Sequence, residues 1–216
     1  MNDKVVIVTG GGRGIGRAIC QRFAEAGAKV IAAARSQDEL AETQRLVESA
    51  GGVCHVTKTD VTRIDNVDAL VAMAPNGPID NFDLAMFDRM VAVNVNAVFY
   101  TCRAVWPVMR ERGGGVIVNI SSMAAVDPFP GFAAYAASKS FVNGLTNALA
   151  KEGAEHGIRV YAVGPGAVDT QMLRGPFPDF PNEQCLQPRD IAESVWFMTQ
   201  PACQHSAGQT IYVSKT

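Results

Sequence analysis

A strand pattern that leads directly into a glycine-rich turn and then into a helix is the feature that most constrains the fold. Residues 4–8 (KVVIV) form a continuous, mostly β-branched run, which is typical of a strand covered on both faces. The turn at residues 9–16 (TGGGRGIG) follows at once, and a helical pattern extends from about residue 14 to residue 26, where Gly27 ends it. This order predicts the first strand and helix of a parallel α/β sheet.

The same rhythm of strands and helices continues to the end of the chain. Further strand patterns lie at residues 30–34, 53–56, 116–120, 160–163 and 210–213. Helical patterns lie at residues 36–50, 84–111, 133–155 and 188–198. Ser36 is expected to cap the helix that follows it, with Glu39 as its capping-box partner. The alternation predicts an α/β protein with a doubly wound parallel sheet (Rossmann-like), and the lack of a linker or internal repeat predicts a single domain over residues 1–216.

Size, charge and composition exclude several classes of protein. The chain has 216 residues, of which 48% are hydrophobic and 19% are charged, as is typical of one soluble globular domain with a substantial core. A net charge of −2 gives no electrostatic basis for binding nucleic acid or an anionic membrane. No apolar stretch reaches the ~18 residues of a membrane span, and the N-terminus passes into a strand pattern without room for a signal peptide. We therefore expect a cytoplasmic protein.

The cysteines and histidines are typical of a cytoplasmic protein without a metal site. The five cysteines include no Cys-x-x-Cys pair, and we expect them to be reduced, buried thiols. The three histidines, His55, His156 and His205, are scattered along the chain. The sequence therefore predicts no metal site.

A tyrosine and a lysine one helical turn apart form the strongest chemical signal. Tyr135 and Lys139 lie in the expected helix at 133–155, and side chains at i and i+4 share a helix face. A nearby ammonium stabilises a phenolate, so we expect Lys139 to lower the pKa of Tyr135 toward neutrality. The pair alone is weak evidence, because surface pairing produces many like it. Ser138 and Ser140 lie on other faces of the helix and are expected to be structural.

Three further features give this pair a context. Ser122 lies thirteen residues before Tyr135, Asn94 lies twenty-eight residues before Ser122, and the chain opens with the glycine turn. Together they resemble the short-chain dehydrogenase/reductase (SDR) family, in its single-domain subgroup, over residues 4 to about 213. The resemblance implies a Rossmann-like nucleotide-binding domain that transfers hydride between a nicotinamide cofactor and a carbonyl or alcohol substrate.

The resemblance also implies a role for each polar residue. Tyr135 would be the general acid/base at the substrate oxygen, where negative charge develops during reduction. Lys139 would also hold the nicotinamide ribose, Ser122 would position the carbonyl, and Asn94 would hold a water that links the lysine to solvent. Ser121 is the rival of Ser122, because successive strand residues face opposite sides and only one can point at the substrate. The family spacing favours Ser122.

The glycine turn is the expected phosphate site. Gly10 permits the tight turn, Gly14 lets the backbone approach a pyrophosphate, and Gly16 lets the helix pack closely on the strand. The helix N-terminus presents free N–H groups and a partial positive charge to the phosphates. The residues expected to bind the cofactor here are Gly10, Gly12, Arg13, Gly14, Ile15 and Gly16.

The end of the second strand decides which nicotinamide cofactor is bound. NAD enzymes place an acidic residue there to bond the ribose 2′-hydroxyl, whereas this chain has Ala34, Arg35 and Ser36. The Arg35 guanidinium suits a 2′-phosphate, and Arg13 in the glycine turn adds a second cation. The sequence therefore favours NADP(H) over NAD(H), the alternative for Arg35 being a solvated charge at a strand end.

Two further segments are expected to contact the cofactor. Asp60 and Val61 follow the third strand, and the resemblance implies that Asp60 accepts from the adenine amino group while Val61 packs nearby. Asp60 also fits the role of a helix cap, and both roles are compatible. The segment 165–170 (PGAVDT) matches the family's segment around the nicotinamide ring. Its candidate contacts are Pro165, Gly166, Val168 and Thr170.

Residues 60–78 depart from the family pattern, in which a helix is followed by a strand that ends in an Asn-Asn-Ala-Gly turn. Residues 67–72 are either that strand, with 72–75 as an altered turn, or the helix, with the strand lost. The strand is favoured, because deleting a central strand would leave buried backbone groups unpaired. The missing turn motivates a second hypothesis, a nucleotide-binding relative that has lost catalysis, although the complete set of four polar residues argues against it.

The substrate side is less specified. The segment between Thr170 and Pro188 is short and contains three prolines, which predicts a short, stiff lid. Five apolar residues are candidates either for a pocket wall or for ordinary core, namely Met123, Phe129, Phe132, Met172 and Phe177. The resemblance implies a small-molecule carbonyl or alcohol substrate and a homodimer or homotetramer. Four aromatic residues on the two long helices are candidates for subunit contacts or for core, namely Phe99, Tyr100, Trp106 and Phe141.

Overall fold

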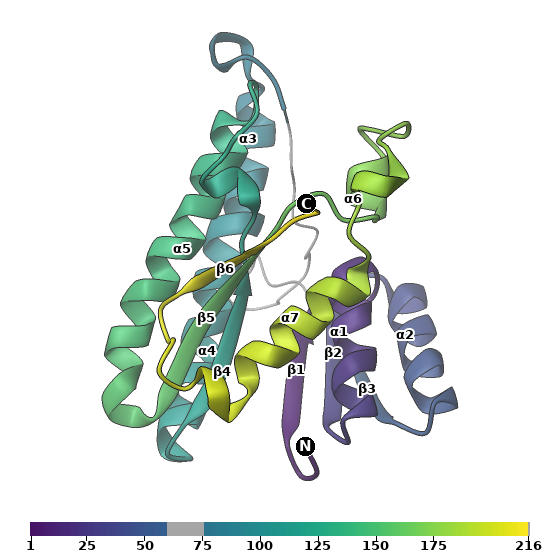
Figure 1. Ribbon diagram of the computed structural model, residues 1–216, viewed down its shortest axis with the longest axis vertical. Helices are drawn as coiled ribbons and strands as arrows, with labels where there is room; N and C mark the ends of the chain where they lie inside the picture. The colour runs from purple at the N-terminus through teal and green to yellow at the C-terminus, as the bar shows by residue number, and fades with distance from the viewer. Residues whose placement is uncertain (60–75, 216) are drawn as a thin grey trace. The chain divides into compact units, whose positions relative to one another are not determined.

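The structure is a computed structural model that describes residues 1–59 and 76–215. The chain divides into two compact units. Unit 1 comprises Met1–Val71 and Val168–Trp196, and unit 2 comprises Ala72–Ala167 and Phe197–Thr216. Each unit contains a three-stranded sheet whose neighbouring strands are parallel, so the predicted α/β class is confirmed (Figure 1).

Unit 1 is built on a sheet in the order β1-β2-β3. Its strands are β1 (Val5–Thr9), β2 (Lys29–Ala34) and β3 (Val53–Lys58). Its helical elements are α1 (Gly14–Glu25), α2 (Gln37–Ser49), α6 (Gln171–Arg174), the 3₁₀ turn η5 (Asn182–Gln184) and α7 (Pro188–Thr199), whose last three residues belong to unit 2. The helices α1 and α2 pack against the sheet and against each other.

The parallel register of this sheet brings the strand ends together. Thr9 of β1 pairs with Ala33 of β2, and Ala34 pairs with Lys58 of β3. The glycine turn leaves β1 at this edge, and Arg35 follows β2 at the same edge. The glycine turn and Arg35, two of the regions predicted to bind the cofactor, therefore start from one end of one sheet.

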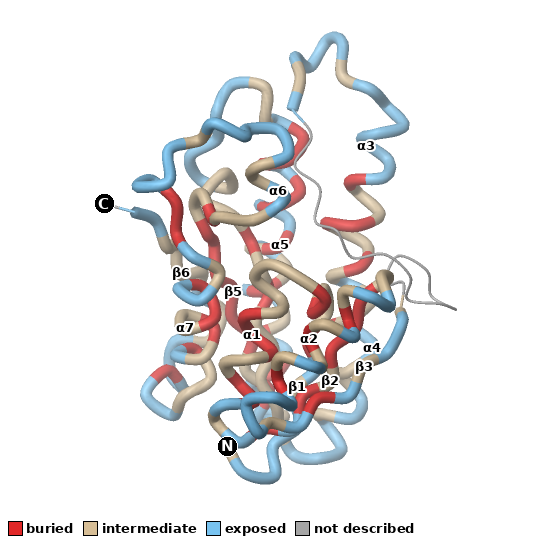
Figure 2. Tube along the Cα trace, turned by 90° about the vertical axis from the view of Figure 1, so that its right-hand side faces the viewer, coloured by how far each residue is buried: buried red, intermediate tan, exposed pale blue. Residues whose placement is uncertain are grey.

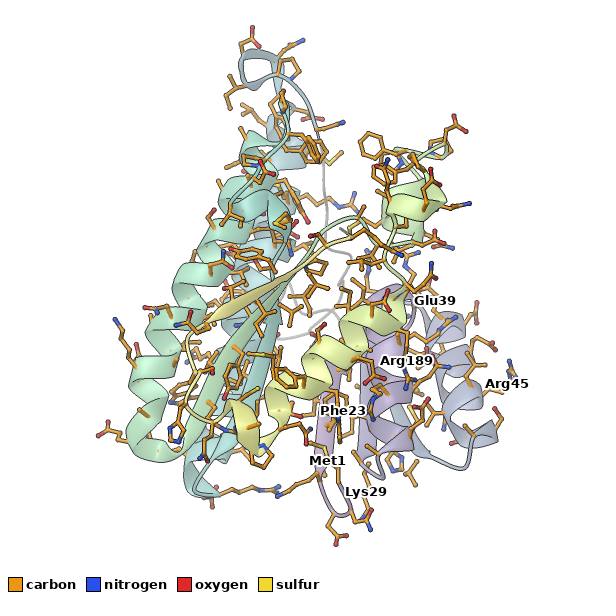
Figure 3. All side chains as sticks on the ribbon, viewed as in Figure 1. Met1, Phe23, Lys29, Glu39, Arg45 and Arg189 are labelled. Atoms are coloured by element: carbon orange, nitrogen blue, oxygen red, sulfur yellow. The ribbon has the colours of Figure 1, made fainter. Side chains whose placement is uncertain are left out.

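The helix α7 joins unit 1 through contacts with α1 (Figure 3). Arg189 makes two hydrogen bonds of 2.7 Å to the Glu25 carboxylate. The rings of Phe23 and Trp196 meet edge to face with their centroids 5.4 Å apart. Two distant parts of the chain are thus held together as one unit.

Unit 2 is built on a second sheet, in the order β4-β5-β6. Its strands are β4 (Gly115–Ile120), β5 (Ile158–Pro165) and β6 (Thr210–Val213). Its main helices are α3 (Leu84–Val91), the π-helical segment η2 (Ala92–Asn96), α4 (Ala97–Glu111) and α5 (Ala133–Gly153). Its 3₁₀ turns are η1 (Ile79–Asn81), η3 (Met123–Ala125), η4 (Ala154–His156) and η6 (Pro201–Cys203). The helix α5 packs on β5 and β4.

The core of unit 2 lies around β5, where Figure 2 shows a buried stretch of chain. Val160, Tyr161, Ala162 and Val163 are all fully buried. The Tyr161 hydroxyl donates to the Cys203 carbonyl oxygen at 2.6 Å, so this buried polar group is satisfied. A strand buried in this way has the continuous apolar sequence from which it was predicted.

The first strand differs from its prediction in one respect. Val8 is 6% exposed, but Val5 and Ile7 are 54% and 56% exposed. Because successive side chains of a strand point to opposite faces, β1 is covered on one face along most of its length, and the expected burial on both faces is wrong for Val5 and Ile7.

The other predicted elements are confirmed wherever the structure describes them, with ends that shift by a few residues. The helix expected at 84–111 is divided into α3, η2 and α4, because its centre adopts π-helical hydrogen bonding. The strand or helix at 67–72 and the altered turn at 72–75 lie outside the described residues.

Three features bear on the function classes considered from composition. All five cysteines are free and buried, as predicted. Within residues 1–59 and 76–215, no group of three His, Cys, Asp or Glu side chains is placed to hold a metal ion. None of the helices in the described part of the chain has both the length and the apolar character needed to cross a membrane.

Candidate active site

In unit 1, the glycine turn packs closely against the first residues of α1. Gly14 has a φ of +52°, a left-handed conformation that favours glycine. A Cβ built on Gly16 would lie 2.1 Å from the Gly10 carbonyl oxygen, so α1 packs this near the turn only because position 16 is glycine. Ile15 is the second residue of α1. The N–H groups of this first turn lack intrahelical partners, so the turn suits a phosphate.

Arg17 and Thr43, which were not among the predicted site residues, hold this turn in place. The buried Thr43 hydroxyl lies 2.9 Å from the Gly11 carbonyl oxygen and 3.1 Å from that of Gly12. Arg17 donates to Thr43 Oγ1 at 3.0 Å and to the Gly12 carbonyl oxygen at 2.5 Å. The sequence did carry a signal for Thr43, because it is a polar residue on the buried face of α2 and needs an internal partner.

The edge of the unit 1 sheet where β1 and β2 end carries a cleft of about 280 Å³. The cleft is lined by the glycine turn, the end of β2 and the start of α2, through Gly10, Gly12, Arg13, Ala34, Arg35, Ser36 and Glu39. The structure therefore brings together Arg13 and Arg35, the two cations predicted for a 2′-phosphate, from separate segments.

Among the described residues that line this cleft, Glu39 is the one with a carboxylate. Ser36 Oγ accepts a hydrogen bond from the Glu39 backbone N–H at 3.3 Å, which confirms the predicted helix cap. The Glu39 carboxylate pairs with Arg13 at 3.1 Å instead of completing the capping box. A residue predicted only as a capping partner thus lines this cleft.

The first part of the lid lies beside the glycine turn. A Cβ built on Gly14 would lie 3.4 Å from Thr170 Cγ2. Thr170 Oγ1 donates to the Val168 carbonyl oxygen at 3.3 Å, and Arg13 Nη1 donates to Gln171 Oε1 at 2.6 Å. Val168 and Thr170 therefore belong to the same unit as the predicted phosphate site.

Arg174 organises the rest of the lid. Its guanidinium bonds to the Asp169 carboxylate at 2.8 Å, to the Phe180 carbonyl oxygen at 2.5 Å and to the Asn182 side chain. These contacts close the lid segment on itself and support the predicted stiffness. The prolines indicated a stiff lid, but a single arginine at its centre has no sequence pattern that marks it.

In unit 2, the end of β4 and the start of α5 bring Ser122, Tyr135 and Lys139 together. Ser122 acts on the Tyr135 phenol and lowers its pKa, so the two side chains lie near each other. Lys139 Nζ lies 5.8 Å from the centroid of the Tyr135 ring and donates to the Ile120 carbonyl oxygen at 3.0 Å. The Ser121 hydroxyl instead donates to the Lys139 carbonyl oxygen at 3.3 Å. Of the two serines, Ser122 is the one beside the tyrosine.

Burial governs the protonation of this tyrosine and lysine. It raises the pKa of Tyr135, and the interaction with Ser122 lowers that pKa by less. It also lowers the pKa of Lys139 to about 8. The net shift of Tyr135 is opposite to the predicted one, because burial costs the phenolate more hydration than the interaction with Ser122 offsets.

Asn94 is buried in the π-helical segment η2. Its Nδ2 donates to Ser138 Oγ at 3.1 Å, and Ser138 Oγ donates to the Tyr135 carbonyl oxygen at 2.7 Å. Asn94 is therefore tied to the turn of α5 that carries Tyr135, through a serine predicted to be structural. Single π-helical turns are frequent at functional sites, and no periodicity in the sequence had marked this one.

The predicted nicotinamide segment at 165–170 spans the boundary between the units. Pro165 ends β5, and the Gly166 N–H donates to the Val213 carbonyl oxygen at 2.8 Å, so both belong to unit 2. Asp60 and Val61, the predicted adenine contacts, lie outside the described residues.

A row of aromatic rings in unit 2 leads to Tyr135. Phe129 and Phe132 meet edge to face with centroids 6.5 Å apart, and Phe132 and Tyr135 do so at 6.1 Å. Phe129 is 75% exposed and is therefore not ordinary core. Met172 and Phe177 of unit 1 are also exposed. The row provides apolar surface next to the tyrosine.

The comparisons with known proteins agree with these arrangements. A family model described as short chain dehydrogenase matches residues 4–80 and 71–179. This chain belongs to the short-chain dehydrogenase family. It is 34% identical to 3β-hydroxysteroid dehydrogenase 1 of Eggerthella lenta, a match that covers 99% of this chain and 93% of that relative.

Solved structures confirm the Rossmann-like fold of this SDR protein. A 3-ketoacyl-(acyl-carrier-protein) reductase from Brucella melitensis complexed with NADH has a TM-score of 0.89 and 29% identity, covering 98% of this chain and 97% of that one. An NAD(P)-dependent dehydrogenase from Beutenbergia cavernae with NADP bound at low occupancy has a TM-score of 0.90 and 29% identity, covering 98% and 95%. The chain is an NAD(P)-dependent oxidoreductase.

The role of Thr43 predicts a loss of stability when its hydroxyl is removed. Thr43→Val keeps the side-chain volume but leaves the Gly11 and Gly12 carbonyl oxygens without this partner. We expect the free energy of unfolding, measured by urea titration, to fall by about 1–3 kcal/mol. Thr101→Val is the control, because the Thr101 hydroxyl donates within its own helix, at 2.8 Å to the Ala97 carbonyl oxygen. Equal losses in the two variants would contradict the role of Thr43.

The buried ammonium of Lys139 predicts a dependence of stability on pH. The pKa of Lys139 is about 8 in the folded protein and returns to 10.5 on unfolding. Between these values the unfolded state binds more protons, so this group makes stability rise with pH from about 8 to about 10.5. Below pH 8 the full cost of burying the charge is present. We expect Lys139→Met to raise the free energy of unfolding at pH 7 by about 1–3 kcal/mol.

Thermal unfolding at pH 7 and pH 9.5 measures this effect. The gain in stability between the two pH values should be smaller in Lys139→Met than in the unmodified protein, since other groups titrate equally in both. Lys151→Met, at the exposed end of α5, is the matched control and should keep the original difference. A Lys139→Met variant that is less stable at pH 7 and keeps the same pH dependence would refute the prediction.

Proposed function

We propose that this protein is an NADP(H)-dependent oxidoreductase that transfers hydride between the nicotinamide and a carbonyl or secondary alcohol, with Tyr135 as the general acid/base. The observation that carries the proposal is the grouping of Ser122, Tyr135 and the buried Lys139, whose Nζ lies 5.8 Å from the centroid of the Tyr135 ring. A proton donor, a second hydroxyl and a cation together suit an oxygen on which negative charge develops.

A bound nicotinamide supplies or accepts the hydride, and the side chains of unit 2 control the substrate oxygen. During reduction, the Tyr135 hydroxyl donates its proton to that oxygen, and the Ser122 hydroxyl donates a hydrogen bond that positions it. Burial keeps the pKa of Tyr135 above its ordinary value, so the phenol is protonated at neutral pH. A protonated phenol is the form that donates, which favours the reductive direction.

Lys139 and Asn94 are proposed to return the proton to Tyr135. A lysine whose pKa is about 8 both gains and loses a proton near neutral pH. Asn94 is anchored through Ser138 to the backbone of Tyr135. In this proposal the Lys139 ammonium reprotonates the Tyr135 phenolate, and a water held by Asn94 reprotonates the lysine.

The preference for NADP(H) rests on the cleft of unit 1. Arg13, Arg35 and Ser36 line it, and guanidinium groups match the geometry and charge of a phosphate. Gly14 and Gly16 leave the start of α1 without side chains that would block a pyrophosphate. We therefore assign the 2′-phosphate to the two arginines and the pyrophosphate to the glycine turn.

The proposed substrate is a small or medium-sized, partly apolar carbonyl compound or alcohol. The exposed Phe129 and the adjacent Phe132 supply apolar surface next to Tyr135. The relative from Eggerthella lenta is named for a hydroxysteroid, whose ring system is largely apolar.

We also propose that the two units work as one catalytic domain over residues 1–216, in the cytoplasm, as a homodimer or homotetramer. Free, buried thiols support a reducing compartment. Phe99 and Phe141 are exposed on α4 and α5, which supports their use between copies of the chain. Trp106 packs instead against the buried cluster around Ile158.

The function is tested by NADPH oxidation across a panel of ketones, aldehydes and ketoacyl thioesters. We expect turnover of at least one class, and we expect Tyr135→Phe to lower its kcat by about 10²–10⁴-fold while NADPH binding is kept. Tyr100→Phe, on α4, is the control and should keep the rate. Tight NADPH binding with no turnover of any substrate would favour a nucleotide-binding protein that has lost catalysis.

The cofactor assignment is tested separately by Arg35→Asp. Reversing this charge should weaken NADPH binding by at least about 100-fold, measured by fluorescence titration, because the new carboxylate repels the 2′-phosphate. NADH carries no such phosphate, so its affinity should change by less than about tenfold. Arg45→Asp, on the outer side of α2, is the control. Equal losses for both cofactors would refute the assignment of Arg35.

A further inference from the structure

The Glu39 carboxylate lies in the same cleft as the two arginines proposed to bind the 2′-phosphate. Glu39 is the third residue of α2, and its carboxylate lines the cleft that also holds Arg13 and Arg35. A Cβ built on Gly12 would lie 3.4 Å from Glu39 Oε2, so the carboxylate lies against the glycine turn. Figure 3 shows Glu39 at the end of α2 that is nearest this turn.

The backbone of Glu39 is held independently of its side chain. Its N–H donates to Ser36 Oγ at 3.3 Å, and its carbonyl oxygen accepts from Arg17 at 3.2 Å. Changing the carboxylate therefore leaves the cap of α2 and the support of the glycine turn in place. The location of the side chain is fixed by the fold, and its charge is free to serve the cleft.

Arg13 shares its guanidinium between two partners. Arg13 Nη1 donates to Glu39 Oε1 at 3.1 Å and to Gln171 Oε1 at 2.6 Å. The side chains of Arg13 and Glu39 are 41% and 34% exposed. Pairs this exposed contribute only about 0–1 kcal/mol, so Arg13 exchanges Glu39 for a stronger anion at little cost.

A carboxylate in this cleft distinguishes the two forms of a nicotinamide dinucleotide. The ribose 2′-hydroxyl of NAD(H) is a hydrogen-bond donor that a carboxylate accepts. The 2′-phosphate of NADP(H) is an anion that the same carboxylate repels and that the arginines attract. The sequence has no acidic residue at the end of β2, but the structure brings one to the same cleft from the first turn of α2.

We propose that Glu39 sets the cofactor selectivity of this enzyme by accepting the 2′-hydroxyl of NAD(H) and opposing the 2′-phosphate of NADP(H). Arg13 is the counter-ion of Glu39. It remains paired with Glu39 when NAD(H) is bound, and it pairs with the 2′-phosphate when NADP(H) is bound. The protein then binds both cofactors, with a preference for NADP(H) that Glu39 limits. The proposal rests on the nicotinamide dinucleotide function proposed above.

The test compares the dissociation constants of NADPH and NADH for the unmodified protein and for Glu39→Gln, by isothermal titration calorimetry of the full chain. We expect the variant to bind NADPH about tenfold more tightly, because a like charge is removed. We expect it to bind NADH about threefold or more weakly, because a charged acceptor is lost. Glu39→Ala should show the same gain for NADPH and a larger loss for NADH.

Glu42→Gln is the matched control, since Glu42 pairs with the exposed Arg45 at 2.8 Å on the same helix. Figure 3 shows Arg45 on the outer side of α2, and neither residue is among those that line the cleft. An NADPH-to-NADH affinity ratio that is the same in Glu39→Gln, Glu39→Ala and the unmodified protein would overturn the role of Glu39 alone. Failure of the unmodified protein to bind either cofactor would instead overturn the proposed function.

Discussion

The parallel register within each sheet is the constraint on which both candidate functional regions depend. In unit 1, Thr9 pairs with Ala33, and in unit 2, Ile120 pairs with Val163. Parallel strands run in one direction, so the segments that leave their carboxyl ends start from the same edge. The glycine turn and Arg35 are brought together in this way in unit 1. The same rule places the segments that carry Ser122 and Pro165 at one edge of the sheet in unit 2.

The two units differ in how far they bury their charged side chains, and each arrangement suits the chemistry proposed for it. Unit 2 buries Lys139 beside Tyr135, and burial raises the pKa of the phenol and lowers that of the ammonium. Unit 1 leaves Arg13 and Glu39 partly exposed, so their ion pair is weak. A buried pair suits proton transfer because its protonation is set by its surroundings. An exposed pair suits recognition because its partners are exchanged readily when a ligand brings its own charge.

Sequence reasoning succeeded where a local pattern has one structural meaning. The strand at 210–213 and the cap at Ser36 follow from periodicity and side-chain chemistry. It failed where the outcome depends on burial or on a distant partner. The pKa of Tyr135 rises because neighbouring elements remove water from it, which the spacing to a lysine does not reveal.

The same division applies to residues that were overlooked. Thr43 and Arg174 act through carbonyl oxygens and side chains that only the folded chain brings near them. The π-helical turn at Asn94 arises inside an apparently regular helix, with no break in the apolar pattern to mark it.

By itself, the sequence determined the α/β class and the order of strands and helices, and it proposed the glycine turn and the set of Asn94, Ser122, Tyr135 and Lys139 as the functional residues. These depend on backbone propensity, apolar periodicity and residue type, all of which are local properties of the chain. Only the tertiary structure decided that Glu39 enters the arginine cleft and that burial shifts the pKa values of Tyr135 and Lys139. Those outcomes depend on which side chains come into contact in the folded chain and on how strongly burial removes their hydration. Neither can be deduced from a short stretch of sequence.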